Sequence, residues 1–346
     1  MKRLCTLALL AVLTGCSEQP AEQTLNVYSW SEYIPDELVQ EFSRETGIKV
    51  NYSTYESNEA MYAKISLLKG EGYDVVFPST YYVAKMAKAG LVQPIDQSRL
   101  TNLANIDPAL LNKAYDPNNK FSLPFMWGST GIAVDTAVID AAEITSWNSL
   151  WDAKYQGKLQ LSDDVREVFQ LALMALGHDG NSQNPAEIEA AFNHLKALMP
   201  NVRSFNSDAQ HAGFLNGDIS LGVVWAAEAV RANSEKPSVQ YLFPKEGAIF
   251  WIDCMVIPSG AKNADAAHKF IDFLLRPDVA KRMVENTGYS TTNLAARPLL
   301  DEATRNNPAI FPPPEVMAKG QFQNDISDEA TALYEKYFEL LKVGAQ

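Results

Sequence analysis

The sequence predicts an α/β protein of two lobes with a hinged cleft between them. Apolar, strand-like runs alternate with helix-like stretches along the chain, the pattern of a mostly parallel sheet with crossover helices. A body of about 320 residues exceeds what one hydrophobic core usually serves. A late strand also returns toward the first half, and a chain that crosses more than once between two lobes makes a hinge.

The first part of the chain contains three strand–helix units. Pro35 is suited to open the first helix, and Gly47 and Gly90 are suited to end the first and third. The expected strands cover residues 25–30, 48–52 and 73–78, and the expected helices cover residues 35–46, 58–69 and 81–89.

An apolar, glycine-containing stretch at 125–134 then carries the chain into a second lobe. Strands are expected there at 158–161 and 219–225, with a returning strand at 250–257. Helices are expected at 165–176, 185–198, 226–233, 264–275, 277–287 and 328–342. We therefore expect lobe 1 to comprise residues 24–130 and 254–303, and lobe 2 to comprise residues 131–253 and 304–346.

The N-terminus has the features of an export signal. Lys2 and Arg3 precede an apolar run at 4–12 that is too short to span a bilayer. It leads into Leu13-Thr14-Gly15-Cys16, which resembles a bacterial lipobox. This resemblance implies a signal peptide at 1–15, a lipid on Cys16 and a polar tether at 16–23. An ordinary signal peptide with an incidental cysteine is the alternative. No later stretch is long enough for a transmembrane helix, so we expect an exported, membrane-anchored protein with a soluble body.

Charge and cysteine content exclude several classes of function. The net charge is -13, and it becomes -15 when Lys2 and Arg3 are removed with the signal. Such acidity argues against nucleic acid as a partner. Cys254 is the only cysteine of the expected body, which excludes an internal disulfide and a cysteine metal site. The four histidines are scattered, so we expect them at the surface, and we expect no metal and no cofactor.

Three acidic-aromatic clusters stand at the edges of strand-like runs, where α/β proteins place ligands. They are Trp30-Ser31-Glu32-Tyr33, Asp163-Asp164-Val165-Arg166-Glu167 and Trp251-Ile252-Asp253. Carboxylates beside aromatic faces can hold a cation by charge pairing and by the ring quadrupole. Several such clusters in one chain indicate an elongated ligand with more than one positive charge, such as a polyamine.

Each cluster also has a structural explanation. Ser31 or Glu32 can cap a helix, and Asp164 and Glu167 have the N-cap to N3 spacing of a capping box. Trp251 and Asp253 share one face of a strand, where Asp253 needs a partner that can also be an internal salt bridge. The residues alone leave these alternatives open.

The chain resembles the substrate-binding proteins of polyamine ABC importers, specifically the spermidine/putrescine type. The resemblance spans nearly all of the mature chain and rests on residues 28–33, 45–50, 53–59, 78–83, 163–170, 243–247, 250–253, 274–280 and 293–297. It implies a two-lobed type II periplasmic binding fold in the periplasm, no enzymatic activity and the permease subunits of an importer as partners.

The resemblance also implies the roles of site residues. Six aromatic residues would box the methylene chain of the ligand: Trp30, Tyr33, Tyr81, Trp225, Trp251 and Tyr289. Four acids would face its ammonium groups: Glu32, Asp164, Glu167 and Asp253. Ser31, Ser79 and Gln323 would add polar contacts. The chain departs from the family at Glu228, which replaces an uncharged residue and is expected to add an acid near one end of the site.

Two other functions fit the same residues less well. A polyamine sensor would present the ligand to a membrane signalling protein, and the ligand site by itself does not distinguish a sensor from a transporter component. A glycosidase would use two of the carboxylates. No nucleophile, base and orienting group stand out together, and the acids match a cation better.

Overall fold

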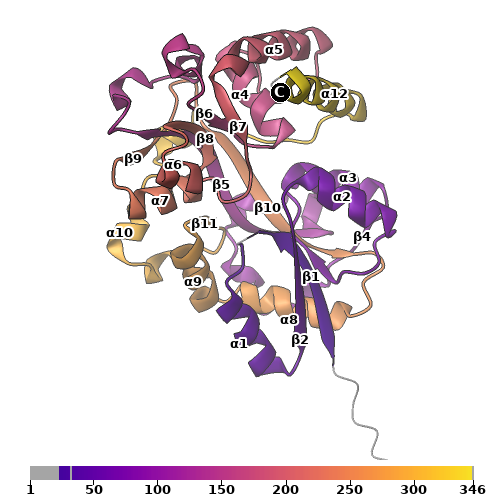
Figure 1. Ribbon diagram of the computed structural model, residues 1–346. Coiled ribbons are helices and arrows are strands. Elements are labelled where there is room, and N and C mark those ends of the chain that lie inside the picture. The colour runs from indigo at the N-terminus through magenta and orange to yellow at the C-terminus, as the bar shows by residue number, and fades with distance from the viewer. Residues whose placement is uncertain (1–22, 32, 345–346) are drawn as a thin grey trace, which may run out of the picture.

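The computed structural model describes residues 23–31 and 33–344, which fold into two α/β lobes joined by long strands (Figure 1). The proposed lipid site Cys16 and the predicted site residue Glu32 lie outside the described residues. Within the described ranges, no helix combines the length and the apolar character needed to cross a membrane.

The first lobe begins with three strand–helix units. They are β1 (Thr24–Trp30), α1 (Asp36–Thr46), β2 (Lys49–Tyr55), α2 (Asn58–Leu67), β3 (Val75–Val76) and α3 (Thr80–Lys88), and β4 (Val92–Gln93) follows. Strand β1 pairs in parallel with β2 and with β3, as the alternation of strands and helices predicts. Helix α1 ends at Gly47, whose φ of 72° favours glycine.

Two long strands, β5 (Ser122–Asp135) and β10 (Ile249–Pro258), run antiparallel to each other between the lobes (Figure 1). The second lobe lies between them in sequence. Its elements are β6 (Leu159–Leu161), α4 (Val165–Ala175), α5 (Pro185–Leu198), β7 (Val202–Phe205), α6 (Ala212–Asn216), β8 (Leu221–Trp225), α7 (Ala226–Glu235) and β9 (Val239–Leu242).

The C-terminal part serves both lobes. Helix α8 (Ala264–Leu274) lies beside β1 of the first lobe, and α9 (Pro277–Thr287) follows it. The chain continues through β11 (Ser290–Thr291), α10 (Glu302–Arg305), α11 (Pro314–Met317) and β12 (Gln321–Phe322). Helix α12 (Asp328–Gly344) then packs beside α4 and α5 at the top of Figure 1, so the chain passes between the lobes a third time.

Short 3-10 helices occupy several connections. They cover Gln97–Arg99, Leu103–Asn105, Pro108–Leu110, Pro117–Asn119, Ala141–Glu143, Trp147–Trp151, Ala153–Tyr155, Met199–Asn201 and Arg297–Leu299.

Each lobe has its own apolar core, as the length of the chain predicts, although Ala227 and Trp251 also pack in the core of the first lobe. In the first lobe, Phe42 of α1 meets Phe270 of α8 with ring centroids 5.0 Å apart. In the second, Phe169 of α4 meets Tyr334 of α12 at 5.0 Å, and Trp147 is fully buried nearby in the same core.

The expectation of a mostly parallel sheet holds only within each lobe. The described strands form one sheet with the order β2-β1-β3-β10-β5-β8-β6-β7, and β10 pairs antiparallel with both β3 and β5. Strand β5 also pairs antiparallel with β8. The strands that join the lobes are not linked to their neighbours by crossover helices, so they need not pair in parallel as the strands of a βαβ unit do.

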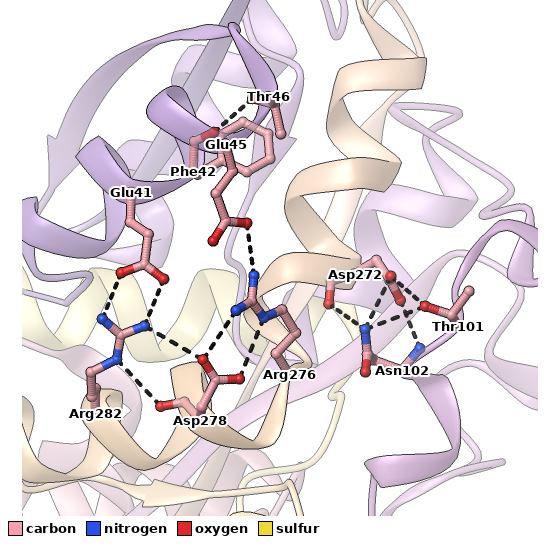
Figure 2. Close-up of polar contacts among 10 residues, drawn as sticks. All are labelled: Glu41, Phe42, Glu45, Thr46, Thr101, Asn102, Asp272, Arg276, Asp278 and Arg282. Atoms are coloured by element: carbon pink, nitrogen blue, oxygen red, sulfur yellow. Dashed lines mark hydrogen bonds and ion pairs between the residues drawn. The ribbon is translucent and has the colours of Figure 1, made fainter.

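Helix α1 is also held to the C-terminal part by ion pairs, which Figure 2 shows. Arg282 of α9 donates to both carboxylate oxygens of Glu41, at 2.7 and 2.9 Å. Arg276, which precedes α9, donates to Glu45 at 2.8 Å. These contacts join segments more than 200 residues apart in sequence.

Candidate ligand-binding site

A cavity lies between the lobes, beside the hinge strand β10. It contains about 700 Å³ of unfilled space, including its open mouth. Every described residue that the family resemblance assigned to the ligand lines it: Trp30, Ser31, Tyr33, Ser79, Tyr81, Asp164, Glu167, Trp225, Trp251, Asp253, Tyr289 and Gln323. The sequence-based prediction therefore selects residues that the fold brings together.

The strand-to-helix turns explain how these residues meet. Trp30 ends β1, Ser79 stands at the N-cap of α3, Asp164 at the N-cap of α4, and Trp225 ends β8 just before α7. Residues at the carboxyl ends of parallel strands gather at one edge of a sheet. Each lobe thus presents this edge to the cavity.

Asp253 is a buried carboxylate held by two hydroxyl groups. Tyr33 donates to its Oδ2 at 2.8 Å, and Ser79 donates to its Oδ1 at 2.6 Å. Asn58 in turn donates to Ser79 Oγ at 3.0 Å, which orients that hydroxyl. Burial raises the pKa of Asp253 to about 7, although both hydrogen bonds favour the ionised form. The partner that Asp253 was expected to need is therefore a pair of neutral hydroxyls.

Glu167 and Asp164 supply two further buried carboxylates. Asp164 caps α4 by accepting a hydrogen bond from the backbone N–H of Glu167 at 3.0 Å. The Glu167 carboxylate turns away from the cap, and its Oε1 accepts from Thr130 at 2.5 Å and from the Trp225 indole at 2.9 Å. The capping reading is thus correct for Asp164 and wrong for the side chain of Glu167.

The charge of Asp164 disfavours the ionisation of the other two carboxylates. Burial, and next the charge of Asp164, raise the pKa of Glu167 to about 7. Burial raises the pKa of Asp164 as well, and the charge of Asp164 adds to the rise at Asp253. A cation placed among them would relieve both the burial of charge and the repulsion.

Aromatic rings form a continuous wall from one lobe to the other. Trp30 lies 6.2 Å from Trp225 across the cavity, and Trp225 lies 6.5 Å from Trp251. Tyr289 continues the wall, 5.3 Å from Trp251 and 5.7 Å from Tyr33 between ring centroids. Such faces suit methylene groups and the hydrogens around an ammonium nitrogen.

Three buried polar atoms of these residues have no hydrogen-bond partner in the described part of the chain. They are Glu167 Oε2, Trp251 Nε1 and Gln323 Nε2. Rotation of the Gln323 amide by half a turn would present an acceptor instead of a donor. Of the three, Glu167 Oε2 is an acceptor to which an ammonium group could donate.

The sequence analysis missed other lining residues, among them Tyr55, Asn58 and Arg231. Tyr55 had a signal, because it ends β2 in register with Trp30 at the end of β1. Asn58 connects Ser79 to Tyr81, donating to the Tyr81 hydroxyl at 2.8 Å. Neither Asn58 nor Arg231 has a local pattern that points to the cavity.

Glu228 lines the cavity, as expected, and its carboxylate has partners within the protein. Its Oε2 lies 2.7 Å from His211 Nδ1 and accepts from the His211 backbone N–H at 3.1 Å. Its Oε1 lies 3.5 Å from Arg231. The expectation that all histidines lie at the surface is also wrong for His268, which is buried and accepts from the Asp96 backbone at 3.0 Å.

Comparisons with known proteins agree with this geometry. The family described as bacterial extracellular solute-binding protein matches residues 37–312. The spermidine/putrescine-binding periplasmic protein of Escherichia coli K12 is 49% identical over 98% of this chain and 97% of its own. The putrescine-binding periplasmic protein PotF of the same organism is 36% identical over 90% of this chain and 89% of its own.

The fold agrees as well. A structure titled putative spermidine/putrescine ABC transporter from Listeria monocytogenes has a TM-score of 0.90 and 34% identity, and the match covers 93% of this chain and 99% of the other. The architecture is thus the two-lobed periplasmic binding protein fold, and the chain is a binding protein, not an enzyme. It belongs to the family of bacterial extracellular solute-binding proteins.

Proposed function

We propose that this protein binds a polyamine of the spermidine/putrescine type and delivers it to the permease subunits of an ABC importer. One observation carries the proposal: three buried carboxylates, Asp164, Glu167 and Asp253, lie together within an aromatic wall. Neutral hydroxyl, indole and backbone groups donate hydrogen bonds to them, and the positive charge of Arg166 acts on Asp164 alone among the three.

A polyamine supplies what these carboxylates lack. Each ammonium group brings a positive charge and several hydrogen-bond donors, and the methylene chain between them brings apolar surface. Burying ammonium groups is costly unless each is paired, and the three carboxylates provide such pairs. Each aromatic face adds a cation–π attraction of about 0.5–2 kcal/mol. Micromolar affinity needs about -8 kcal/mol in total.

The proposal also covers where the protein is located, how it is anchored and how its chain divides into lobes. The relatives named above are periplasmic polyamine-binding proteins, which supports a periplasmic location and transport rather than sensing. We propose in addition that Cys16 carries the lipid that anchors the chain. We propose lobes of 24–130 with 254–303 and of 131–253 with 304–346, which the two main apolar cores support except that Ala227 and Trp251 pack in the first.

A thermal-shift panel with putrescine, spermidine, norspermidine and spermine tests the proposal, followed by calorimetry on the amines that stabilise. At least one amine should raise the melting temperature of the wild-type protein. Asp253→Asn should lower its affinity by about a hundredfold, because truncating a buried charge pair costs several kcal/mol. No stabilisation by any of the four amines would exclude polyamines as ligands, and unchanged affinity in Asp253→Asn would exclude the site assignment.

A further inference from the structure

One end of the cavity carries a positive charge of the protein's own. Glu228 and Arg231 both belong to α7, three residues apart, and both line the cavity. Arg231 Nη1 lies 3.5 Å from Glu228 Oε1, while His211 takes the other oxygen of Glu228 at 2.7 Å. The side chains are 26%, 9% and 15% exposed for Arg231, Glu228 and His211, so the group is largely withdrawn from solvent.

This group lies on the Tyr289 side of the cavity. Burial raises the pKa of Tyr289, the charge of Glu228 raises it further and Arg231 lowers it, with smaller effects from Asp253 and Glu167. At Tyr81, the neighbouring charges are instead Asp164, Glu59 and Arg166. Geometry agrees with this placement, because the start of α7 lies against the turn before Tyr289: a Cβ at Gly288 would lie 3.5 Å from Ala227. Asp164 instead begins α4, whose Arg166 lies over the Tyr81 ring.

The two ends would treat an ammonium group differently. Near Asp164 and Glu167, an incoming ammonium meets carboxylates whose hydrogen bonds come from neutral groups. The positive charge that acts on Asp164 belongs to Arg166, which lies over the Tyr81 ring and does not line the cavity. At the other end, Glu228 already has His211 and Arg231 as partners. A guanidinium stays charged at all relevant pH values, so it would repel an ammonium group that reached it.

We propose that Arg231 limits the length of the amine that the protein prefers, because its guanidinium holds the end of the cavity where the outermost ammonium of a longer polyamine would lie. The protein then favours a diamine over a triamine or tetraamine. This inference rests on the proposed polyamine function and replaces the expectation that Glu228 serves as a further acid for the ligand.

The alternative is that Arg231 only neutralises Glu228 and steadies the start of α7, as an i,i+3 ion pair can. A steadying role would affect all amines equally. A length limit would change the ratio of the affinities for two amines measured on the same protein, and this ratio does not depend on overall stability.

Calorimetry with putrescine and spermidine on Arg231→Gln provides the test. The preference for putrescine over spermidine should shift toward spermidine by about tenfold or more, the effect of about one charge–charge interaction. Arg231→Met, which also lacks the charge, should shift the ratio in the same direction, and Arg231→Lys should retain the wild-type preference. Arg282→Gln is the matched control: Arg282 pairs with Glu41 (Figure 2) and neither residue lines the cavity, so both affinities should stay as in wild type.

Each outcome has one meaning. An unchanged ratio in Arg231→Gln and Arg231→Met, or an equal loss of affinity for both amines, would overturn the length limit while leaving the polyamine function in place. A wild-type protein that prefers spermidine would also overturn it. Wild-type protein that binds neither amine would refute the proposed function itself, and the length limit with it.

Discussion

We expect Asp253 and Glu167 to release protons when the proposed ligand binds. Burial raises the pKa of both to about 7, well above the usual values for these side chains. The ligand-free folded protein thus retains protons that the unfolded chain releases near pH 4. The resulting stabilisation is fully present at low pH and is lost as the pH rises through about 7. A cation among these carboxylates has the opposite effect, because it favours their ionised forms.

We therefore expect polyamine affinity to fall as the pH is lowered below about 7, by up to about tenfold per pH unit for each carboxylate that must lose a proton. As the pH rises from about 5 to about 8, ionisation of these two groups should lower the melting temperature of the ligand-free protein. The increase in melting temperature that the ligand causes should become larger over the same range. Calorimetry in buffers of different ionisation enthalpy should detect proton release on binding. Asp253→Asn should release fewer protons, and an affinity that does not vary with pH would contradict this coupling.

At the scale of residues, spacing predicted only local contacts. It identified Asp164 as a cap, because the cap and the capped N–H are three residues apart. It could not predict that Glu167 accepts from Thr130 and Trp225, which are 37 and 58 residues away. Resemblance to a family placed Glu167 and Trp225 at the ligand, but it did not predict these hydrogen bonds. It could not supply Arg231, which is no part of the pattern that the chain shares with that family.

At the scale of elements, the pairing of β5 with β10 positions Trp251. Gly128 is the register partner of Trp251, and a Cβ at Gly128 would come within 2.5 Å of the indole ring. Gly128→Ala should push the ring out of place and weaken polyamine binding by about tenfold or more, since Trp251 is part of the aromatic wall. Calorimetry would measure the loss.

The control for this variant is Gly217→Ala. Gly217 has a φ of 77° and open space around its Cβ position, so alanine there strains the backbone without touching the cavity. It should lower stability by about 1 kcal/mol and leave affinity unchanged. Equal affinities for Gly128→Ala and wild type would show that this contact does not position the ring.

The ion pairs that join α1 to the C-terminal segment in Figure 2 should contribute little to stability. The side chains of Arg282 and Glu41 are 30% and 20% exposed, so solvent and salt screen the pair. Arg282→Gln should lower the free energy of unfolding by about 1 kcal/mol or less, and by less at high salt. Urea unfolding at low and high salt measures this, and a loss of several kcal/mol would show that the pair holds α1 in place.

Sequence signals predicted elements well wherever the chain itself marks their ends. Helices α5 (Pro185–Leu198) and α9 (Pro277–Thr287) both begin at a proline, and both have the predicted bounds. Strand β3 was predicted over six residues and covers only Val75–Val76, and the two-residue strands β11 and β12 were missed. These short strands form because a strand distant in sequence lies beside them. A local sequence pattern does not contain that information.

At the scale of the whole molecule, the candidate site exists only when the lobes are together. Asp164, Glu167 and Trp225 come from the second lobe, Trp30, Tyr33 and Ser79 come from the first, and Asp253 stands on the hinge strand β10. Length and the returning strand predicted two lobes, but neither predicts how far the cleft closes. The contact of Trp30 with Trp225, at 6.2 Å, shows a cleft closed enough for rings of both lobes to meet.

Closure should depend on the ligand, because ionised Asp253 repels the carboxylates that the second lobe brings toward it. Without an amine, the protein at about pH 8 should favour a more open arrangement, and spermidine or putrescine should shift it toward the closed one. Small-angle X-ray scattering should then show a smaller radius of gyration with the amine than without it. Asp253→Asn removes a repelling charge, so it should close more readily without ligand at this pH. Identical scattering of the wild-type protein with and without a bound amine would show that binding does not drive closure.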